Sequence, residues 1–347
     1  MADWLLVETF GGDRREPTVL AVGSGTRNMV PLSRILGRGR NLGDVRDLIA
    51  TVVQSATTIH TTTADGSRQM IGHPLCTYGG RVHGVYVWVG QHDEVPPPRD
   101  PAGAWHVNMT HYISSRSDDL LALFHARPGN RQHVHSLAEL FAGRLASGRY
   151  GRLTTNTDEA AALAKLVDSR AGDEHQATWT ATRDDDEKRA VNFAFRTLAE
   201  PNENREMELV ARGITHDIGP AESTAAAPSP RPILLAELVI AAEQTPGRWR
   251  AIVNLHTLRL LRWLDEPMPD VVWEYRSPYP PAIHRRDLRK AVEVSRELAN
   301  SGHVTTELRF RATDGGWTRL VVHARLMLLN QHTTAALVTL SRPATNS

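Results

Sequence analysis

Histidine is the residue type through which this chain could hold a metal ion or a haem, and it occurs sixteen times. His73 and His83 have the most suggestive spacing, because a β-hairpin centred on Gly79 would place both on one sheet face beside Leu75 and Val85. Two interpretations of the pair stay open. One is a haem or metal ligand, and the other is the more common half-buried, hydrogen-bonded histidine.

The other metal-like patterns lack the ligands that a closed site needs. His133 and His135 form an HxH pair without a third ligand, which indicates solvated side chains. The run Asp184–Glu187 lacks the EF-hand spacing with its glycine and distal glutamate, so we interpret it as a solvated turn. Cys76 is the single cysteine, which excludes cysteine-based zinc or iron–sulfur sites and disulfides within one chain. The sequence predicts no metal site.

The patterns that would indicate an enzyme are also missing. Gly23–Gly25 and Gly37–Gly39 lack the Gly-Lys-Ser/Thr of a phosphate-binding loop, and no G-x-S-x-G motif occurs. Signatures of histidine kinases, diguanylate cyclases and phosphodiesterases are not recognisable. The run His284–Lys290 could contact an acidic partner, but the simpler interpretation is an exposed helix start. We therefore assign no catalytic residue.

Composition narrows the class of protein further. Forty basic and thirty-nine acidic residues give a net charge of +1, without the basic excess of nucleic-acid-binding proteins. No apolar run approaches the roughly 20 residues of a membrane helix. The start MADWLLVETFGGD lacks the features of a signal peptide. We expect a soluble, cytoplasmic protein that contacts neither nucleic acid nor membrane.

Two stretches have the composition of linkers, and they divide the chain into three expected domains. Asp93–Gly103 is rich in proline and charge, and Gly219–Pro232 is an Ala/Ser/Pro segment with little to bury. The expected domains are residues 1–92, 104–219 and 232–342. In the first, we expect a helix at Leu42–Thr57 and the strands Trp4–Phe10, Thr18–Val22, Ile59–Thr63, Arg68–Thr77 and Arg81–Val89.

The second and third segments repeat one pattern of elements. Placing Gly172 over Gly302, an offset of 130, aligns helix, strand, acidic turn and strand without a gap. The second segment is expected to hold helices Asp118–His125 (capped by Ser117), Ser136–Ala146 and Asp158–Arg170, with strands Ala104–Thr110, His175–Thr182, Ala190–Leu198 and Glu208–Ile214. The third is expected to hold helices Pro232–Glu243, His256–Leu264 and Leu288–Asn300 (capped by Asp287), with strands Trp249–Leu255, Val304–Ala312, Thr318–Leu329 and Thr334–Ser341.

These residues resemble the GAF and PAS families of sensor domains. Ile283–Leu288 is similar to the start of the long PAS helix, and Glu307–Trp317 to the PAS run of strand, Asp-Gly turn and Trp. Gly213–Ile218 is similar to the end of many PAS domains, and Pro74–Val85 to the last GAF hairpin. The resemblance implies an α+β fold of three tandem GAF/PAS-like domains, each an antiparallel sheet of about five strands packed with helices. A GAF–PAS–PAS chain without an effector resembles sensor-only proteins.

The resemblance also implies where a ligand would bind. In a PAS-like cup the strand residues that face the helices line the cavity, and here these are Trp179, Val191, Phe193 and Phe195 in the second segment and Phe310, Leu320 and Val322 in the third. The alternative is a solid core filled by the same side chains. The flavin-binding cysteine motif and the cyclic-nucleotide signature of these families are absent, so the cofactor is unknown.

We predict a non-enzymatic sensor or scaffold in signal transduction. A small ligand or a protein partner would shift one domain, and the other domains would relay the shift through the linkers. The apolar helix Pro232–Glu243 is the expected relay, packed within the chain or across a homo-oligomer. Two alternatives remain: an enzyme that uses one cup as its active site, and a pure interaction scaffold without a ligand.

Overall fold

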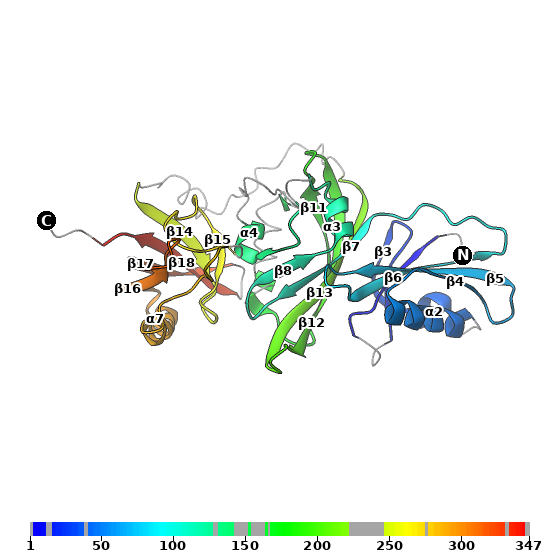
Figure 1. Ribbon diagram of the computed structural model, residues 1–347, viewed down its shortest axis with the longest axis horizontal. Coiled ribbons are helices and arrows are strands. Elements are labelled where there is room, and N and C mark those ends of the chain that lie inside the picture. The colour runs from blue at the N-terminus through cyan, green and yellow to red at the C-terminus, as the bar shows by residue number, and fades with distance from the viewer. Residues whose placement is uncertain are drawn as a thin grey trace.

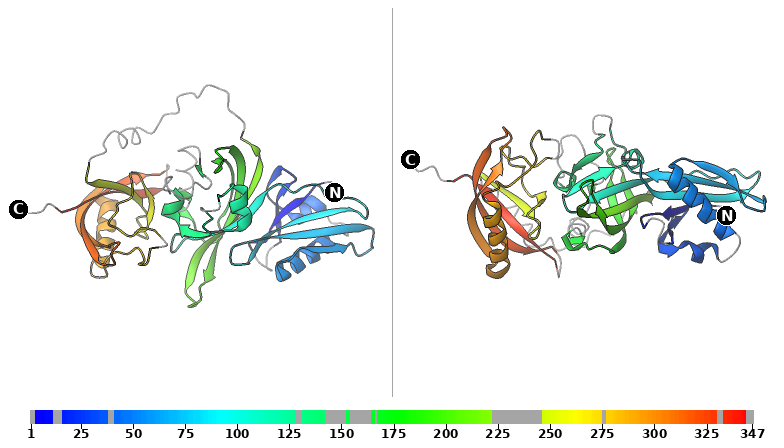
Figure 2. Two further views of the ribbon diagram at one scale, coloured as in Figure 1. Left: turned by 45° about the horizontal axis from the view of Figure 1, so that its top comes forward. Right: turned by 60° about the horizontal axis from the view of Figure 1, so that its bottom comes forward.

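The computed structural model describes residues 3–11, 16–37, 41–127, 131–141, 152–153, 164–165, 167–221, 246–274, 277–329 and 333–343. The strands form three antiparallel sheets of six, seven and five strands, which confirms the α+β organisation in tandem domains. The three domains lie in a row, with the middle domain between the other two (Figures 1 and 2). Among the described residues, no helix is long and apolar enough to cross a membrane.

The N-terminal sheet carries its helices on one face. Val45, Leu48 and Val52 recur at the three-to-four-residue spacing of a helix and are buried, so α2 packs this side on the sheet. The elements are β1 (Leu5–Glu8), β2 (Thr18–Val22), β3 (Gly25–Pro31), α1 (Leu32–Leu36), α2 (Asn41–Ser55), β4 (Ile59–Thr62), β5 (Arg68–Cys76) and β6 (Val82–Gln91).

The middle and C-terminal domains have longer meanders. The middle domain contains β7 (Ala102–Asn108), β8 (Ile113–Arg116), α3 (Asp118–Leu123), β9 (Val134–Ser136), α4 (Leu137–Phe141), β10 (Arg152–Leu153), β11 (Glu174–Thr182), β12 (Lys188–Pro201) and β13 (Met207–Pro220). The C-terminal domain contains β14 (Arg248–Val253), β15 (Leu260–Trp263), α7 (Leu288–Ser301), β16 (His303–Arg311), β17 (Trp317–Leu328) and β18 (Thr334–Ser341).

All three sheets share one strand order. Three consecutive meander strands are followed by the first strand of the domain and then by its second strand. The orders are β4-β5-β6-β1-β2, β11-β12-β13-β7-β8 and β16-β17-β18-β14-β15, with extra edge strands in the first two sheets. The repeat predicted between the second and third segments is therefore confirmed in strand order, and the first domain shares it.

The offset between the two repeats is 129 and not 130. The β11–β12 pairing begins with Glu174 opposite Arg196, and the β16–β17 pairing begins with His303 opposite Arg325. Asp173 causes the difference, because it is an extra residue between Gly172 and β11. Aligning the glycines therefore shifted every strand residue by one, which exchanges the two faces of a strand.

A common aspartate turn follows the first meander strand of each domain. Asp65, Asp185 and Asp314 each accept a hydrogen bond from the backbone N–H two residues later, at 3.0, 3.1 and 2.7 Å. The residue after the aspartate has positive φ in every case: Gly66, Asp186 and Gly315. Aspartate side chains commonly close turns in this way, and glycine suits the left-handed position.

One predicted helix of the C-terminal domain is wrong. His256–Leu264 contains a turn and strand β15, whose Trp263 pairs with Ala251. The side chain of Asn254 accepts hydrogen bonds from two following backbone N–H groups, and Leu258 has a φ of 56°, so the chain reverses. Helix Pro232–Glu243 lies outside the described residues, as does most of Asp158–Arg170. The described start of Ser136–Ala146 contains helix α4 (Leu137–Phe141).

Of the two residues predicted to cap helices, one does so with its side chain and the other does not. Ser117 caps α3 as expected, because its hydroxyl accepts the backbone N–H of Leu120. Asp287 occupies the cap position of α7 but does not cap it with its side chain. Its carboxylate instead accepts two hydrogen bonds from the guanidinium of Arg309, at 2.8 and 2.6 Å.

The predicted linker Asp93–Gly103 is fastened to the N-terminal domain. The indole of Trp4 donates to the carbonyl of Pro97 at 2.7 Å, and the hydroxyl of Tyr86 donates to the carbonyl of Asp100 at 2.5 Å. The guanidinium of Arg99 lies 5.6 Å from both aromatic rings. This segment is therefore a strap across the sheet and not a free spacer.

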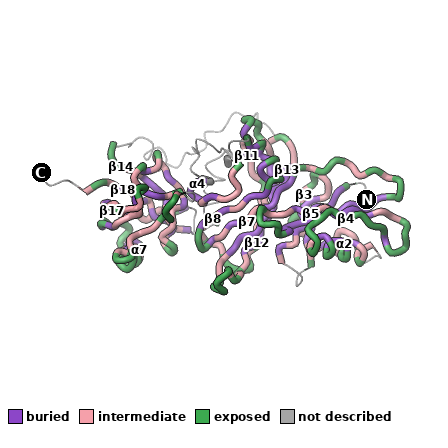
Figure 3. The backbone as a smooth tube through the Cα atoms, viewed as in Figure 1, coloured by how far each residue is buried: buried purple, intermediate pink, exposed green. Residues whose placement is uncertain are grey.

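Adjacent domains share hydrophobic cores. Tyr86 and Trp88 of the N-terminal sheet lie in one cluster with Ala194 and Ile214 of the middle sheet. A second cluster joins Phe195 and Tyr112 to residues of the C-terminal domain, including Ile252, Leu261 and Leu329. Figure 3 shows buried backbone in all three sheets, whereas α7 and the hairpin tips are exposed. The domains are therefore joined through packed sheet faces.

Candidate functional site

The four predicted pocket residues of the middle domain lie on one face of its sheet. Trp179 pairs with Val191, and His175 pairs with Phe195, with Phe193 between them along β12. Side chains alternate between the two faces, so all of these residues project to the same side. Val191 lies there in one cluster with the apolar residues of α3. The predicted orientation toward the helices is confirmed, and a role in ligand binding stays a prediction.

These side chains form a row of aromatic rings. The ring of Trp179 lies 4.9 Å from that of Phe193, and Phe195 lies 5.2 Å from the imidazole of His175 and 5.7 Å from Trp105. Val191 is fully buried, but Trp179, Phe193, His175 and Trp105 are half-buried. Sequence reasoning missed His175 and Trp105, although the period of two along β11 would have placed His175 beside Trp179.

His175 brings a polar atom to this apolar face. Its Nε2 is buried and has no hydrogen-bond partner among the described residues. Burial lowers the pKa of the imidazole, and the positive charge of Lys165 lowers it further. The ring is therefore neutral at pH 7 and can donate or accept one hydrogen bond. An aromatic row with one unpaired imidazole nitrogen can hold a planar apolar molecule with a single polar group.

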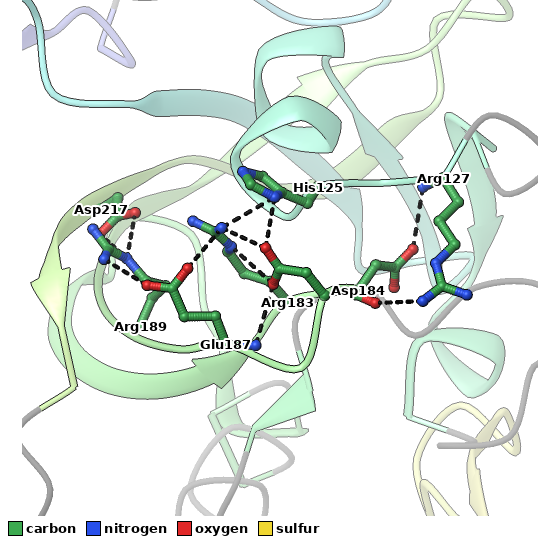
Figure 4. A network of polar contacts seen from close by, with 8 residues as sticks. His125, Arg127, Arg183, Asp184, Glu187, Arg189 and Asp217 are labelled. Carbon is green, nitrogen blue, oxygen red and sulfur yellow. Dashed lines mark hydrogen bonds and ion pairs between the residues drawn. The ribbon is translucent and has the colours of Figure 1, made fainter.

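A polar network closes one end of the face (Figure 4). Arg183, in the turn between β11 and β12, contacts Asp185 at 2.6 Å and Glu187 at 2.8 Å and reaches the imidazole of His125 just after α3 at 3.0 Å. Hydrogen bonds from Arg183 hold the pKa of the Asp185 carboxyl well below its usual range. The network fixes α3 against the hairpin, which positions the helix over the sheet.

The acidic run Asp184–Glu187 is thus only partly the solvated turn that its sequence predicts. Asp184 is buried, and its carboxylate accepts the backbone N–H of Arg127 at 3.2 Å. Glu187 also contacts Arg189, which in turn forms two hydrogen bonds to the carboxylate of Asp217. Arg183 and Arg189 flank the run in the sequence, whereas Arg127 comes from the segment after α3. The interpretation as a solvated turn included none of these pairings.

The predicted pocket residues of the C-terminal domain lie in its core. Leu320 and Val322 are buried, and Phe310 packs against the same cluster. That cluster includes Ala291 and Leu298 of α7, so these three residues face the helix as expected. Their place is equivalent to that of the middle-domain face, and the same cluster also holds the ring pair of Trp263 and Trp273, whose centroids are 6.4 Å apart.

His83 lies between the N-terminal and middle domains, and His73 lies on β5 of the N-terminal sheet. Leu75 belongs to the face that packs on the middle domain, whereas Val85 belongs to the face beneath α2, so the predicted surroundings are wrong in part. The Nδ1 of His73 lies 2.7 Å from the hydroxyl of Thr58. Among the described residues, no group of three or more metal-ligating side chains could hold an ion.

His83 is the more buried of the two histidines. Its Nδ1 lies 3.4 Å from the carbonyl of Gly213, and its ring meets that of Phe10 edge-on at 5.8 Å. Burial, with a contribution from Arg212, lowers the pKa of His83 to about 3. Burial, with Arg99, lowers the pKa of His73 to about 4. Both rings are therefore neutral at pH 7.

Comparison with protein families accounts for nearly the whole chain. Family models described as Rv3651-like N-terminal, middle and C-terminal domains match residues 3–98, 102–217 and 233–347. The chain consists of three Rv3651-like domains. None of the curated proteins matches it.

A solved structure shares the arrangement of the whole chain. The crystal structure of an uncharacterised protein from Mycobacterium tuberculosis is 28% identical, with a TM-score of 0.76 over 99% of this chain and 97% of that one. An RNA-binding light-oxygen-voltage receptor matches at 11% identity over 69% of this chain and 95% of that one, but a TM-score of 0.24 is too low to support an argument. Neither description names a GAF or PAS domain, so that assignment stays a prediction.

A buried ion pair joins the N-terminal and middle Rv3651-like domains. The guanidinium of Arg196 on β12 donates two hydrogen bonds to Glu8 on β1, at 2.9 and 3.2 Å, and both side chains are buried. Glu8 also accepts the hydroxyl of Thr18 and the backbone N–H of Phe10, each at 2.7 Å. Arg196 contacts Glu174 as well. Buried charges that are paired and hydrogen-bonded fix the relative placement of the two sheets.

Proposed function

We propose that this chain is a non-enzymatic sensor or scaffold of the GAF/PAS type, and that its middle domain binds a small planar ligand. The common strand order of the three sheets is compatible with tandem sensor domains. The observation that carries the ligand proposal is the half-buried aromatic row with the unpaired Nε2 of His175. Aromatic side chains bind a flat apolar surface, and one polar atom orients it.

The packed domain interfaces supply a route for the signal. Phe195 belongs both to the aromatic row and to the cluster shared with the C-terminal domain. On the opposite face of the same strands, Ala194 and Arg196 contact the N-terminal domain. A ligand that moves β12 would therefore act on both neighbours directly. We place the relay between the N-terminal and middle domains in their interface and not in Asp93–Gly103, because that segment is hydrogen-bonded to the N-terminal domain.

Native mass spectrometry of freshly purified protein tests the proposal. We expect a co-purifying small molecule, or saturable binding of a planar aromatic compound from a panel followed by ligand-observed NMR. Trp179→Ala should weaken binding by at least roughly tenfold, because one stacking surface is lost. Trp317→Ala is the matched control, since Trp317 lies in the C-terminal domain outside the row.

Two results would count against ligand sensing. If no molecule co-purifies and no compound binds, the ligand proposal is wrong and a pure interaction scaffold is left. If binding occurs but Trp179→Ala and Trp317→Ala weaken it equally, the ligand sits elsewhere. Turnover of a bound compound would overturn the non-enzymatic assignment.

A further inference from the structure

The start of α7 in the C-terminal domain is unusually basic. Arg285 and Arg286 precede the helix, and Arg289 and Lys290 lie in its first turn, which contains no acidic residue. The N-terminal end of a helix carries partial positive charge, so cations there are unfavourable for folding. Residues that oppose helix stability at an exposed position are candidates for a role in binding.

The local acids neutralise this cluster only in part, because one of them pairs with Arg289. Asp287 is engaged by Arg309 at 2.6 Å, and Glu293 by Arg289 at 2.9 Å. Glu307 lies 3.7 Å from Arg319. Arg285 and Arg286 are exposed, and no ion pair to either is found within the described part of the chain.

Apolar side chains lie within the same basic surface. Leu288 is 47% exposed and Val292 is 41% exposed, and their spacing of four places them side by side on α7. Trp317 is 37% exposed and meets His284 edge-on at 4.7 Å, which joins the start of β17 to the segment before the helix. In Figure 1, α7 lies at the lower edge of the C-terminal domain, which is at the opposite end of the row from the N-terminal domain.

We propose that this surface binds an acidic segment of a partner protein that carries apolar side chains. We call it the α7 patch and define it by Arg285, Arg286, Leu288, Val292 and Trp317. Charge complementarity selects the acidic segment, and the exposed apolar residues of the patch select leucine or aromatic residues within that segment. The proposal does not depend on ligand binding by the middle domain.

Fluorescence anisotropy of the full chain tests the α7 patch. The probes are labelled peptides of roughly twelve residues, half of them Asp or Glu, with leucine or phenylalanine at helical spacing. We expect at least one peptide to bind saturably and to lose affinity when NaCl rises from about 0.15 M to about 0.5 M. Arg285→Glu with Arg286→Glu, and separately Leu288→Asp, should each weaken that binding at least roughly tenfold.

Matched variants separate the patch from general electrostatics. Arg27→Glu with Arg34→Glu makes the same charge change at exposed positions of the N-terminal domain and should leave affinity unchanged. Failure of every peptide to bind overturns the proposal, as does equal weakening by both charge reversals. Binding that survives Leu288→Asp also overturns it. Tighter binding of a single-stranded oligonucleotide than of any peptide would assign the patch to nucleic acid instead.

Discussion

Replacing Arg196 with methionine should destabilise the protein by about 3 kcal/mol, because Glu8 would stay buried without its cationic partner. Breaking a buried ion pair from one side costs about 3–5 kcal/mol. The lower end applies here, because Glu8 keeps two donors: the hydroxyl of Thr18 and the backbone N–H of Phe10, both at 2.7 Å. Methionine retains much of the aliphatic volume of the arginine side chain, so a cavity adds little to this loss of stability.

Urea unfolding followed by tryptophan fluorescence measures this loss. Arg46→Met is the matched control, because Arg46 pairs with Glu16 at 2.8 Å on the surface. An exposed pair contributes about 0–1 kcal/mol, so the control should unfold close to the parent. The double variant Glu8→Leu with Arg196→Met should recover much of the loss, since it removes the uncompensated charge.

Equal unfolding free energies for Arg196→Met and Arg46→Met would refute this reasoning. The contact between the N-terminal and middle domains would then be no more than a surface contact. Hydrogen exchange offers a second readout. Arg196→Met should raise exchange in β1 and β6, the strands nearest the interface, and leave α7 unchanged.

Three further predictions concern the same domain faces. Gly84→Ala should lower the melting temperature sharply, because its Cβ would lie 2.4 Å from Ile214, whereas Gly79→Ala meets no atom within 4 Å and should be tolerated. In the parent, protonation of His83 on unfolding should lower the free energy of unfolding by about 2 kcal/mol between pH 7.5 and 5. His83→Phe should not show this part of the loss, and urea unfolding at the two pH values measures it. The folded pKa of His83, about 3, lies below its ordinary 6.5, so the stabilisation is present above pH 6.5 and is lost as pH falls. Unchanged pH dependence would show that this histidine is not neutral and buried. Ser117→Ala should cost about 1–2 kcal/mol in the same assay, since it removes the α3 cap, and a loss no larger than that of Arg46→Met would contradict it.

Most of the longer strands and the two long helices could be predicted from the sequence, because they depend on local patterns. Strands β3, β8, β9 and β10 were not predicted, and β15 was predicted as part of a helix. Val85, Val87 and Val89 alternate as a strand does, and β6 spans them. Val45, Leu48 and Val52 recur at helical spacing, and α2 contains them. The repeat of the second and third domains was visible as well, although the extra Asp173 moved its register by one residue.

The sequence by itself determined the repeat of the second and third domains and the face on which Trp179, Phe193 and Phe195 lie, since alternation along a strand is a property of neighbouring residues. The strand order that the three sheets share comes from the structure. Only the tertiary structure decided which faces meet. Glu8 and Arg196 are 188 residues apart, and no local pattern links them. The same holds for His175 and Trp105, which become neighbours of Phe195 only when β7, β11 and β12 join one sheet. Such long-range contacts depend on how strands pair and how sheets pack against each other. The free energy of that packing is a property of the folded chain and not of any single segment.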